Sequence, residues 1–283
     1  MKVIKISIAL SALLAVAFSS CSDDVLREKR DLTGYNEQVY QDSLLAQAYV
    51  DYVYFLFRPG SGVNGQIYSR EFGTTTSLCE ESPGEVAYIN NYLNGGNIAE
   101  DYAQAPGYFG AKMTTSVGNN TWTRIRQINL FLKNIDEYGK GYLSKDWRNK
   151  LKGQLYYWRA VQYFELVRMY GGVPIITEPQ NAIATTEEEL KPLQIPRSST
   201  SACIDFICQD LDSAIAMLPS VWPDAATQYG RITKGAAAGQ KGRVLLTYAS
   251  PQFNPTDDQT RWQQAYEACR NANILCLAAG NGL

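Results

Sequence analysis

Residues 144–174 read SKDWRNKLKGQLYYWRAVQYFELVRMYGGVP, and this stretch decides the fold. The spacing of its apolar residues predicts one long helix from a capping Ser144 to Tyr170. The apolar side chains are Trp147, Leu151, Leu155 and Trp158 on one side and Tyr156, Ala160, Tyr163, Phe164 and Val167 on the other. A helix that is apolar on nearly every side lies between other helices. Gly171-Gly172 follows this helix, so we interpret the pair as a C-cap and not as a phosphate-binding loop, which would open a helix.

Further helices are predicted on both sides of this one, and strand signals are nearly absent. The predicted ranges are 36–57, 121–139, 198 or 199 to 219, 233–248, and 257 or 258 to 272. Taken in antiparallel pairs, with large residues opposite small ones, these helices resemble degenerate tetratricopeptide hairpins. The sequence therefore predicts an all-α-dominated fold of tetratricopeptide-like helical hairpins with long irregular loops.

The last two predicted helices carry surfaces for close packing. Residues 235–242 are rich in Gly and Ala, which lets a neighbouring helix approach closely. The final helix places Trp262, Ala265, Tyr266, Cys269 and Ala272 on one stripe.

Two segments are too long to be simple connections between helices. Residues 171–197 are rich in proline and contain TTEEE at 185–189, which predicts one short capped turn. Its glutamates could supply a glycosidase-like carboxylate pair, but adjacent residues on a turn point in different directions. We interpret them as a solvated face. Residues 60–120 are longer still, and their many aromatic residues argue against disorder.

Segment 60–120 interleaves aromatic rings with short amides and carboxylates, the mixture that a carbohydrate site needs. Sugars offer apolar C–H faces that stack on rings, and hydroxyls that take directed hydrogen bonds. Tyrosine suits a peptide-binding surface for similar reasons, and the rings can instead pack the segment onto the helices. The candidate ligand-binding residues are Glu80, Glu81, Asn91, Tyr92, Asn94, Tyr102 and Tyr108.

The N-terminus is typical of an exported lipoprotein. Lys2 and Lys5 precede an apolar run that is shorter than a membrane-spanning helix, and Ser19-Ser20-Cys21 follows it. We predict a signal peptide over residues 1–20, a lipid anchor on Cys21 and a polar tether over 21–35. The alternative is ordinary secretion with an incidental cysteine.

Composition excludes several classes of function. The 26 basic and 28 acidic residues become 24 and 28 once the signal peptide is removed, so charge does not favour nucleic acid or anionic lipid. Histidine is absent, which excludes Ser-His-Asp, Cys-His and histidine-metal chemistry. We predict no catalytic residues, no metal and no cofactor.

Five cysteines remain after Cys21, at positions without zinc-binding spacing. They are Cys79, Cys203, Cys208, Cys269 and Cys276. We interpret most of them as buried small apolar side chains, with one disulfide as the alternative.

Several ordered motifs resemble one known family. RA at 159–160, YF at 163–164 and ELVRMYGGVPII at 165–176 are similar to the "RA..YF.LVR.YGGVPLI" hallmark of the SusD/RagB family of outer-membrane nutrient-binding lipoproteins. The blocks RITKGAA, KGRV and YASPQFN, at 231–237, 241–244 and 248–254, are similar to its second block. WTRI at 122–125 with Ile128-Asn129 matches a further helix, with Arg126 where an aromatic residue is common.

The resemblance implies a lipoprotein of the cell outer membrane, facing the exterior, that sits as a lid over a TonB-dependent (SusC-like) transporter. It implies capture of oligosaccharides, or of peptides in some members, for nutrient uptake, and no enzymatic activity. Residues 36–283 form the SusD-like helical domain in this interpretation. Family members are considerably longer, with much of their aromatic ligand surface in the C-terminal half, so we expect this chain to hold the N-terminal portion and at most part of the pocket.

Two other functions stay open from the sequence. The helical hairpins can serve as a protein-interaction scaffold that binds no sugar. A glycoside hydrolase is the third hypothesis, and it predicts turnover that is lost when Glu80 or Glu81 is changed.

Overall fold

The central helix α10 (Lys145–Tyr170) of this computed structural model confirms the helix predicted at 144–170. Ser144 caps it by accepting a hydrogen bond from the backbone N–H of Trp147 at 3.1 Å. The helix ends at Gly171, whose φ of 70° lies in the left-handed region that favours glycine. The structure describes residues 37–57, 121–181 and 184–280, which all belong to one unit of the chain.

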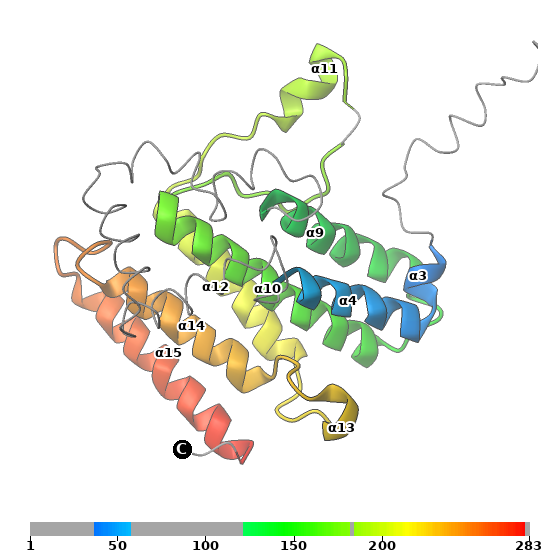
Figure 1. Cartoon of the computed structure of the whole chain (residues 1–283). Helices are drawn as coiled ribbons and strands as arrows, with labels where there is room; N and C mark the ends of the chain where they lie inside the picture. The colour runs from blue at the N-terminus through cyan, green and yellow to red at the C-terminus, as the bar shows by residue number, and fades with distance from the viewer. Residues whose placement is uncertain (1–36, 58–120, 182–183, 281–283) are drawn as a thin grey trace, which may run out of the picture. The chain divides into compact units, whose positions relative to one another are not determined.

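Helices make up the regular structure of the described residues, which contain no strand. The long ones besides α10 are α4 (Ser43–Phe57), α9 (Thr121–Tyr138), α12 (Thr200–Met217), α14 (Lys234–Ala249) and α15 (Gln259–Ala278) (Figure 1). The short ones are α3 (Gln38–Gln41), α11 (Glu187–Leu190), the 3₁₀ helix η2 (Lys191–Leu193) and α13 (Ala225–Gln228). The all-α prediction is confirmed.

The predicted continuous helix over 36–57 is wrong, because Asp42 breaks it. Asp42 has an extended backbone, with φ −97° and ψ 130°. Its carboxylate accepts hydrogen bonds from the backbone N–H groups of Leu44 and Leu45 at 2.8 and 3.0 Å. The side chain therefore caps a new helix, α4, as Asp prefers to do at a helix start.

Consecutive long helices pack in antiparallel pairs, as expected for helical hairpins. Between α10 and α12, Arg159 binds Asp210, and one turn further along α10 Tyr163 meets Phe206, which lies one turn earlier on α12. The same order of neighbours continues from α9 to α15, since α9 packs on α10, α12 on α14 and α14 on α15 (Figure 1). α10 lies between several helices, which explains why its apolar residues occupy nearly every side.

The closest helix pair is α14 and α15, where glycines face cysteines. A Cβ on Gly242 would lie 2.8 Å from the Sγ of Cys269, and one on Gly235 would lie 2.9 Å from the Sγ of Cys276. The two glycines are two turns apart on α14, and the two cysteines are two turns apart on α15. The two contacts therefore repeat in register along helices that run in opposite directions. The predicted small-residue surface is confirmed.

The core divides into buried clusters that share α10. One cluster joins α10 with α9, α12 and α14 and includes Ile125, Ala160, Tyr163, Phe164, Leu166, Ile207, Leu211 and Val244. Another joins α10 with α3, α4 and α9 and includes Tyr40, Tyr49, Val53, Ile128, Phe131, Leu151 and Leu155. α10 is therefore the central helix of the described unit.

The predicted burial of the cysteines holds only in part. Cys203 is buried, but Cys269 is exposed, and the four cysteines in the described ranges are free. On the same helix as Cys269, Ala265 is buried while Tyr266 is 62% exposed. The apolar stripe of α15 is therefore narrower than predicted.

A buried polar network fixes the segment that follows α10. Arg159 donates to both carboxylate oxygens of Asp210, at 2.7 and 2.8 Å, and to the side-chain oxygen of Asn129 at 2.7 Å. Asn129 in turn donates to the carbonyl of Ile176 at 2.9 Å, and the N–H of Ile176 donates to the hydroxyl of Tyr163 at 2.8 Å. Residues from α9, α10 and α12 together hold this segment against the bundle.

Candidate ligand-binding site

The residues predicted to bind ligand lie outside the described part of the chain. Glu80, Glu81, Asn91, Tyr92, Asn94, Tyr102 and Tyr108 all fall within 58–120, and Cys21 falls within 1–36. Their roles stay predictions. A site has to be sought among the helices themselves.

An aromatic hollow lies where the end of α4 meets the loop before α14, and we call it the aromatic groove. It is lined by Asp51, Tyr54, Phe55 and Phe57 of α4, by Trp158 of α10, and by Thr227 and residues 229–232. Its volume is about 630 Å³, which is within the usual range for small-molecule sites.

Stacked rings form the floor of the aromatic groove. Phe57 lies parallel to Trp158 with 4.5 Å between ring centroids, and Tyr54 meets Trp158 edge-on at 5.1 Å. Such offset and edge contacts are the favoured geometries of aromatic pairs. The floor is therefore held in place by the core.

Two further rings at the groove are open to solvent. Phe55 is 56% exposed and Tyr229 is 93% exposed. Exposed aromatic side chains beside a hollow can contact a ligand without giving up packing contacts within the protein. They are the rings on which a sugar face can stack.

An ion pair adds directed polar groups to the groove. Arg231 donates to both carboxylate oxygens of Asp51, at 2.6 and 3.2 Å, and to the side-chain oxygen of Gln154 at 3.3 Å. The pair joins residues 180 positions apart in the sequence. A paired guanidinium and carboxylate fix each other's orientation while leaving lone pairs and N–H groups for a ligand.

Tyr54 connects the floor to the loop. Its hydroxyl accepts a hydrogen bond from the N–H of Ile232 and donates one to Gln154, both at 3.0 Å. Burial raises the pKa of Tyr54 above its ordinary value, so the phenol stays protonated at any physiological pH. Its role here is to position the loop, and nothing in its surroundings activates it as an acid or base.

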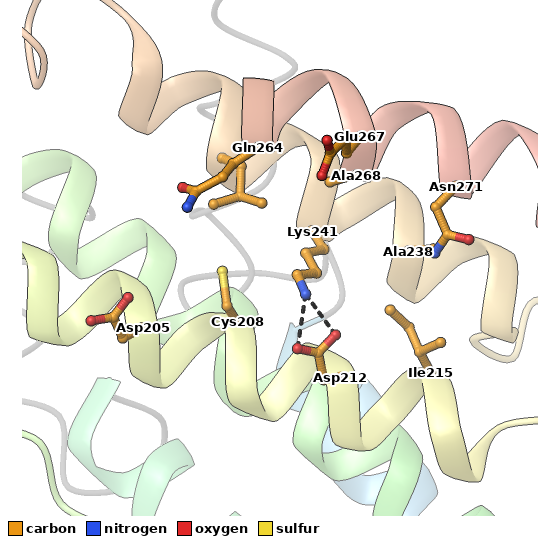
Figure 2. Close-up of a pocket in the computed structure, with 11 residues that line it drawn as sticks. Asp205, Cys208, Asp212, Ile215, Ala238, Lys241, Gln264, Glu267, Ala268 and Asn271 are labelled. Carbon is orange, nitrogen blue, oxygen red and sulfur yellow. Dashed lines mark hydrogen bonds and ion pairs between the residues drawn. The ribbon is translucent and has the colours of Figure 1, made fainter. Parts of the chain in front are cut away.

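A second hollow, shown in Figure 2, lies between α12, α14 and α15. Its volume is about 430 Å³, and Lys241 crosses it to bind both carboxylate oxygens of Asp212 at 2.7 and 2.8 Å. Cys208 faces the same space, and burial raises the pKa of its thiol to about 11. The thiol is therefore neutral and unreactive at neutral pH.

This second hollow is a weaker candidate for a sugar site than the aromatic groove. Its lining consists of carboxylates, amides, aliphatic side chains, one lysine and one cysteine, without an aromatic ring. Its cation is already paired with Asp212. It offers hydrogen bonds but no flat apolar face for a sugar ring.

The glutamates at 187–189 form the short capped turn that the sequence predicts. Thr186 and Glu189 make a capping box at the start of α11. Hydrogen bonds from the backbone N–H groups of Thr185 and then Thr186 lower the pKa of Glu189. A glycosidase general acid needs a raised pKa, so Glu189 has the opposite tuning.

The described residues contain neither a metal-binding cluster nor a membrane-spanning helix. No group of three or more His, Cys, Asp or Glu side chains there could hold a metal ion. No helix there is long and apolar enough to cross a membrane.

Comparison with known proteins decides the family. A family model described as starch-binding and associating with the outer membrane matches residues 29–246, which is more than half of the chain. The chain belongs to the SusD-like family. The resemblance seen in the sequence motifs is confirmed.

Individual SusD-like relatives agree with this assignment. The SusD-like protein P38 of Formosa agariphila is 26% identical over 159 residues, and P25 of the same organism is 25% identical over 162. These matches cover 51% and 56% of this chain but 28% and 26% of the relatives. The chain therefore spans much less than the length of the SusD-like proteins it matches.

Solved SusD-like structures share the fold. A SusD-like carbohydrate-binding protein of Bacteroides fragilis has a TM-score of 0.57 at 18% identity, over 84% of this chain and 41% of that protein. A SusD homologue of Bacteroides thetaiotaomicron has a TM-score of 0.54 at 22% identity, over 89% and 44%. The helical hairpins of this chain are those of the SusD-like fold.

Sequence reasoning missed the aromatic groove although it had noted some of its residues, among them Trp158 and Arg231. Arg231 opens the RITKGAA motif, and we read that motif only as a mark of the family. Tyr54 and Phe55 fall within the helix predicted at 36–57, but helical spacing does not show which other segment a helix face meets. Because the groove combines α4 with a loop far along the chain, only the fold brings these residues together.

Proposed function

We propose that this SusD-like protein is a lipoprotein of the outer-membrane surface that captures oligosaccharides and passes them to a TonB-dependent, SusC-like transporter. In this proposal an acyl group on Cys21 holds it at the membrane, and it catalyses no reaction. The aromatic groove supplies one sugar-binding surface. Residues 80–108 add further contacts in the same proposal.

The observation that carries the proposal is the combination of exposed rings and an oriented ion pair in one hollow. Phe55 and Tyr229 offer flat apolar faces, and Arg231 with Asp51 offers donors and acceptors beside them. The family description as starch-binding supports the same ligand class. A related solved structure is named a carbohydrate-binding protein, which also agrees.

The test is calorimetric titration of the full mature chain with a panel of neutral oligosaccharides. We expect at least one sugar to bind, and we expect Tyr229→Ala and Phe55→Ala each to weaken that binding roughly fivefold or more, about 1 kcal/mol. The loss follows from removing the face on which the sugar ring stacks.

Tyr266→Ala is the matched control, because Tyr266 is also an exposed tyrosine but lies on α15, away from the groove lining. It should leave the affinity unchanged. Equal losses in Tyr266→Ala and Tyr229→Ala would argue against the groove. No heat with any sugar would argue against glycan capture as a whole.

A protein-interaction scaffold or a peptide-binding member of the family is the second candidate function. Exposed apolar side chains favour it, since Leu44, Ile274 and Leu277 are each more than half exposed. Co-purification with a membrane partner that no sugar influences would support the scaffold. Adding peptides to the titration panel tests whether the protein is instead a peptide-binding member of the family.

A further inference from the structure

A third hollow lies at the start of α9, on the side of that helix that faces the segment after α10. It is lined by Trp122, Thr123, Ile125 and Arg126 of α9 and by Ile176, Glu178 and Gln180. Its volume is about 260 Å³, below the usual range for drug-sized ligands, so it suits one sugar unit of a longer chain. We call it the α9 cavity.

The cation that lines the α9 cavity is Arg126. Arg126 is half-buried, and its Nε is buried without a hydrogen-bond partner in the described part of the chain. No ion pair of Arg126 occurs among the described residues either. A partly desolvated guanidinium with unused N–H groups favours an incoming anion over a neutral group.

The neighbouring charges do not cancel this preference. Glu178 also lines the cavity, but its carboxylate lies 3.6 Å from the ammonium of Lys133. Lys133 lies two turns beyond Arg126 on α9 and is the cation that pairs with Glu178. The Glu178 carboxylate is therefore engaged with Lys133 and not with Arg126.

The position of the cavity wall is fixed by the buried network. The carbonyl of Ile176 accepts a hydrogen bond from Asn129 on α9, and its N–H donates to Tyr163 on α10. Glu178 and Gln180 follow directly on this anchored residue. Their distance from Trp122 and Arg126 is thus set by core contacts and not by a free loop.

We infer that the α9 cavity is a subsite for an acidic sugar unit. The carboxylate or sulfate group of the sugar pairs with the terminal nitrogens of Arg126. The apolar face of the sugar ring lies against Trp122, and Gln180 and Glu178 bind its hydroxyls. This inference rests on the proposed glycan capture and adds that the glycan carries negative charge.

The experiment uses the full mature chain and compares ligands with and without a charged group on the same sugar backbone. Oligogalacturonate and its fully methyl-esterified counterpart form one pair, and a sulfated galactan oligosaccharide and its desulfated form make the other. Inorganic sulfate is titrated alone. We expect the charged member of at least one pair to bind roughly ten- to a hundredfold more tightly, the worth of one charge-assisted hydrogen-bond pair.

Variants then assign the preference to Arg126. Arg126→Gln should remove the difference in affinity between the charged and the neutral ligand, whereas Arg126→Lys should keep much of that difference. Arg270→Gln is the matched control, because Arg270 is an exposed arginine of α15 far from the cavity lining. It should change neither affinity.

Each other outcome overturns the inference in a recognisable way. If neutral oligosaccharides bind and charge makes no difference, the inference fails while glycan capture stands. Equal losses in Arg126→Gln and Arg270→Gln would mean general electrostatic attraction and no subsite. If inorganic sulfate binds as tightly as the sulfated sugar, the site recognises only an anion. If no glycan binds, both proposals fail.

Discussion

The pairing of Arg159 with Asp210 is the main charged interaction buried in the described core. Both side chains are more than nine-tenths buried, and the guanidinium makes two hydrogen bonds to the carboxylate and a third to Asn129. Removing water from two charges costs free energy, which this geometry offsets. Removing either partner therefore leaves a buried, unpaired charge that destabilises the folded state.

Arg159→Met should therefore lower the free energy of unfolding by about 3–5 kcal/mol, because it leaves Asp210 buried and unpaired. Urea unfolding followed by circular dichroism measures the change. The double variant Arg159→Met with Asp210→Leu should be more stable than the single one, since no uncompensated charge remains.

Lys241→Met removes one partner of an exposed ion pair and serves as the comparison. The Asp212 side chain that pairs with Lys241 is 57% exposed, so we expect the free energy of unfolding to fall by only about 0–1 kcal/mol. A loss in Arg159→Met no larger than this would contradict the account of the buried pair.

These residues show what the sequence could predict at the scale of single side chains. Arg159 and Tyr163 were identifiable as parts of a family motif, but a motif does not state a role. The structure shows that they hold Asn129 and Ile176. Asn129 lies 30 positions from Arg159, and Ile176 lies 13 positions from Tyr163. Contacts over such distances in the sequence are defined only by how the helices pack.

At the scale of helices, the α14–α15 pair depends on glycines that admit a close neighbour. Gly242→Ala should lower the free energy of unfolding by about 1–2 kcal/mol. The added Cβ would lie 2.8 Å from the Sγ of Cys269 and 3.3 Å from its backbone. Overpacking of this kind outweighs the better helix propensity of alanine. Thermal or urea unfolding measures it.

Gly239→Ala is the control on the same helix. A Cβ there meets nothing within 4 Å. The substitution should raise the free energy of unfolding by up to about 1 kcal/mol, through helix propensity alone. If both variants changed stability in the same direction, the close approach at Gly242 would not be the cause.

Helices were predictable where local signals agree, and less so where one residue decides. Ser144, Ser199 and Thr233 cap helices close to where the sequence placed them. Asp42 was overlooked, because the apolar residues that predict this helix all follow it and do not fix where the helix begins. A capping side chain inside a predicted helix can end one helix and begin the next, and the spacing of apolar residues alone does not reveal this.

At the scale of the whole molecule, the fold class followed from the sequence and the candidate site did not. Helical periodicity depends on residues that are close in the sequence, so a single sequence is enough to predict it. The aromatic groove joins α4 to residues 227–232, and the α9 cavity joins residues 122–126 to 176–180. Neither set is close in sequence. The predicted ligand residues at 80–108 lie outside the described ranges and stay predictions.

The proposed place of the protein at the membrane depends on one thiol. Cys21 follows the predicted signal peptide directly, and lipoprotein processing needs a cysteine at that position to accept a diacylglyceryl group. Cys21→Ala should therefore abolish labelling by radioactive palmitate in growing cells and release the protein from the membrane fraction, because lipid chains supply the membrane affinity.

The matched variant for this labelling experiment is Cys269→Ala, which removes an exposed cysteine from α15 and keeps Cys21. It should incorporate palmitate as the unaltered chain does. If Cys21→Ala still carried label, the anchor would lie elsewhere. If it lost the label but stayed in the membrane fraction, contacts with a membrane partner would hold the protein there, and the transporter contact would then carry more of the attachment than the lipid.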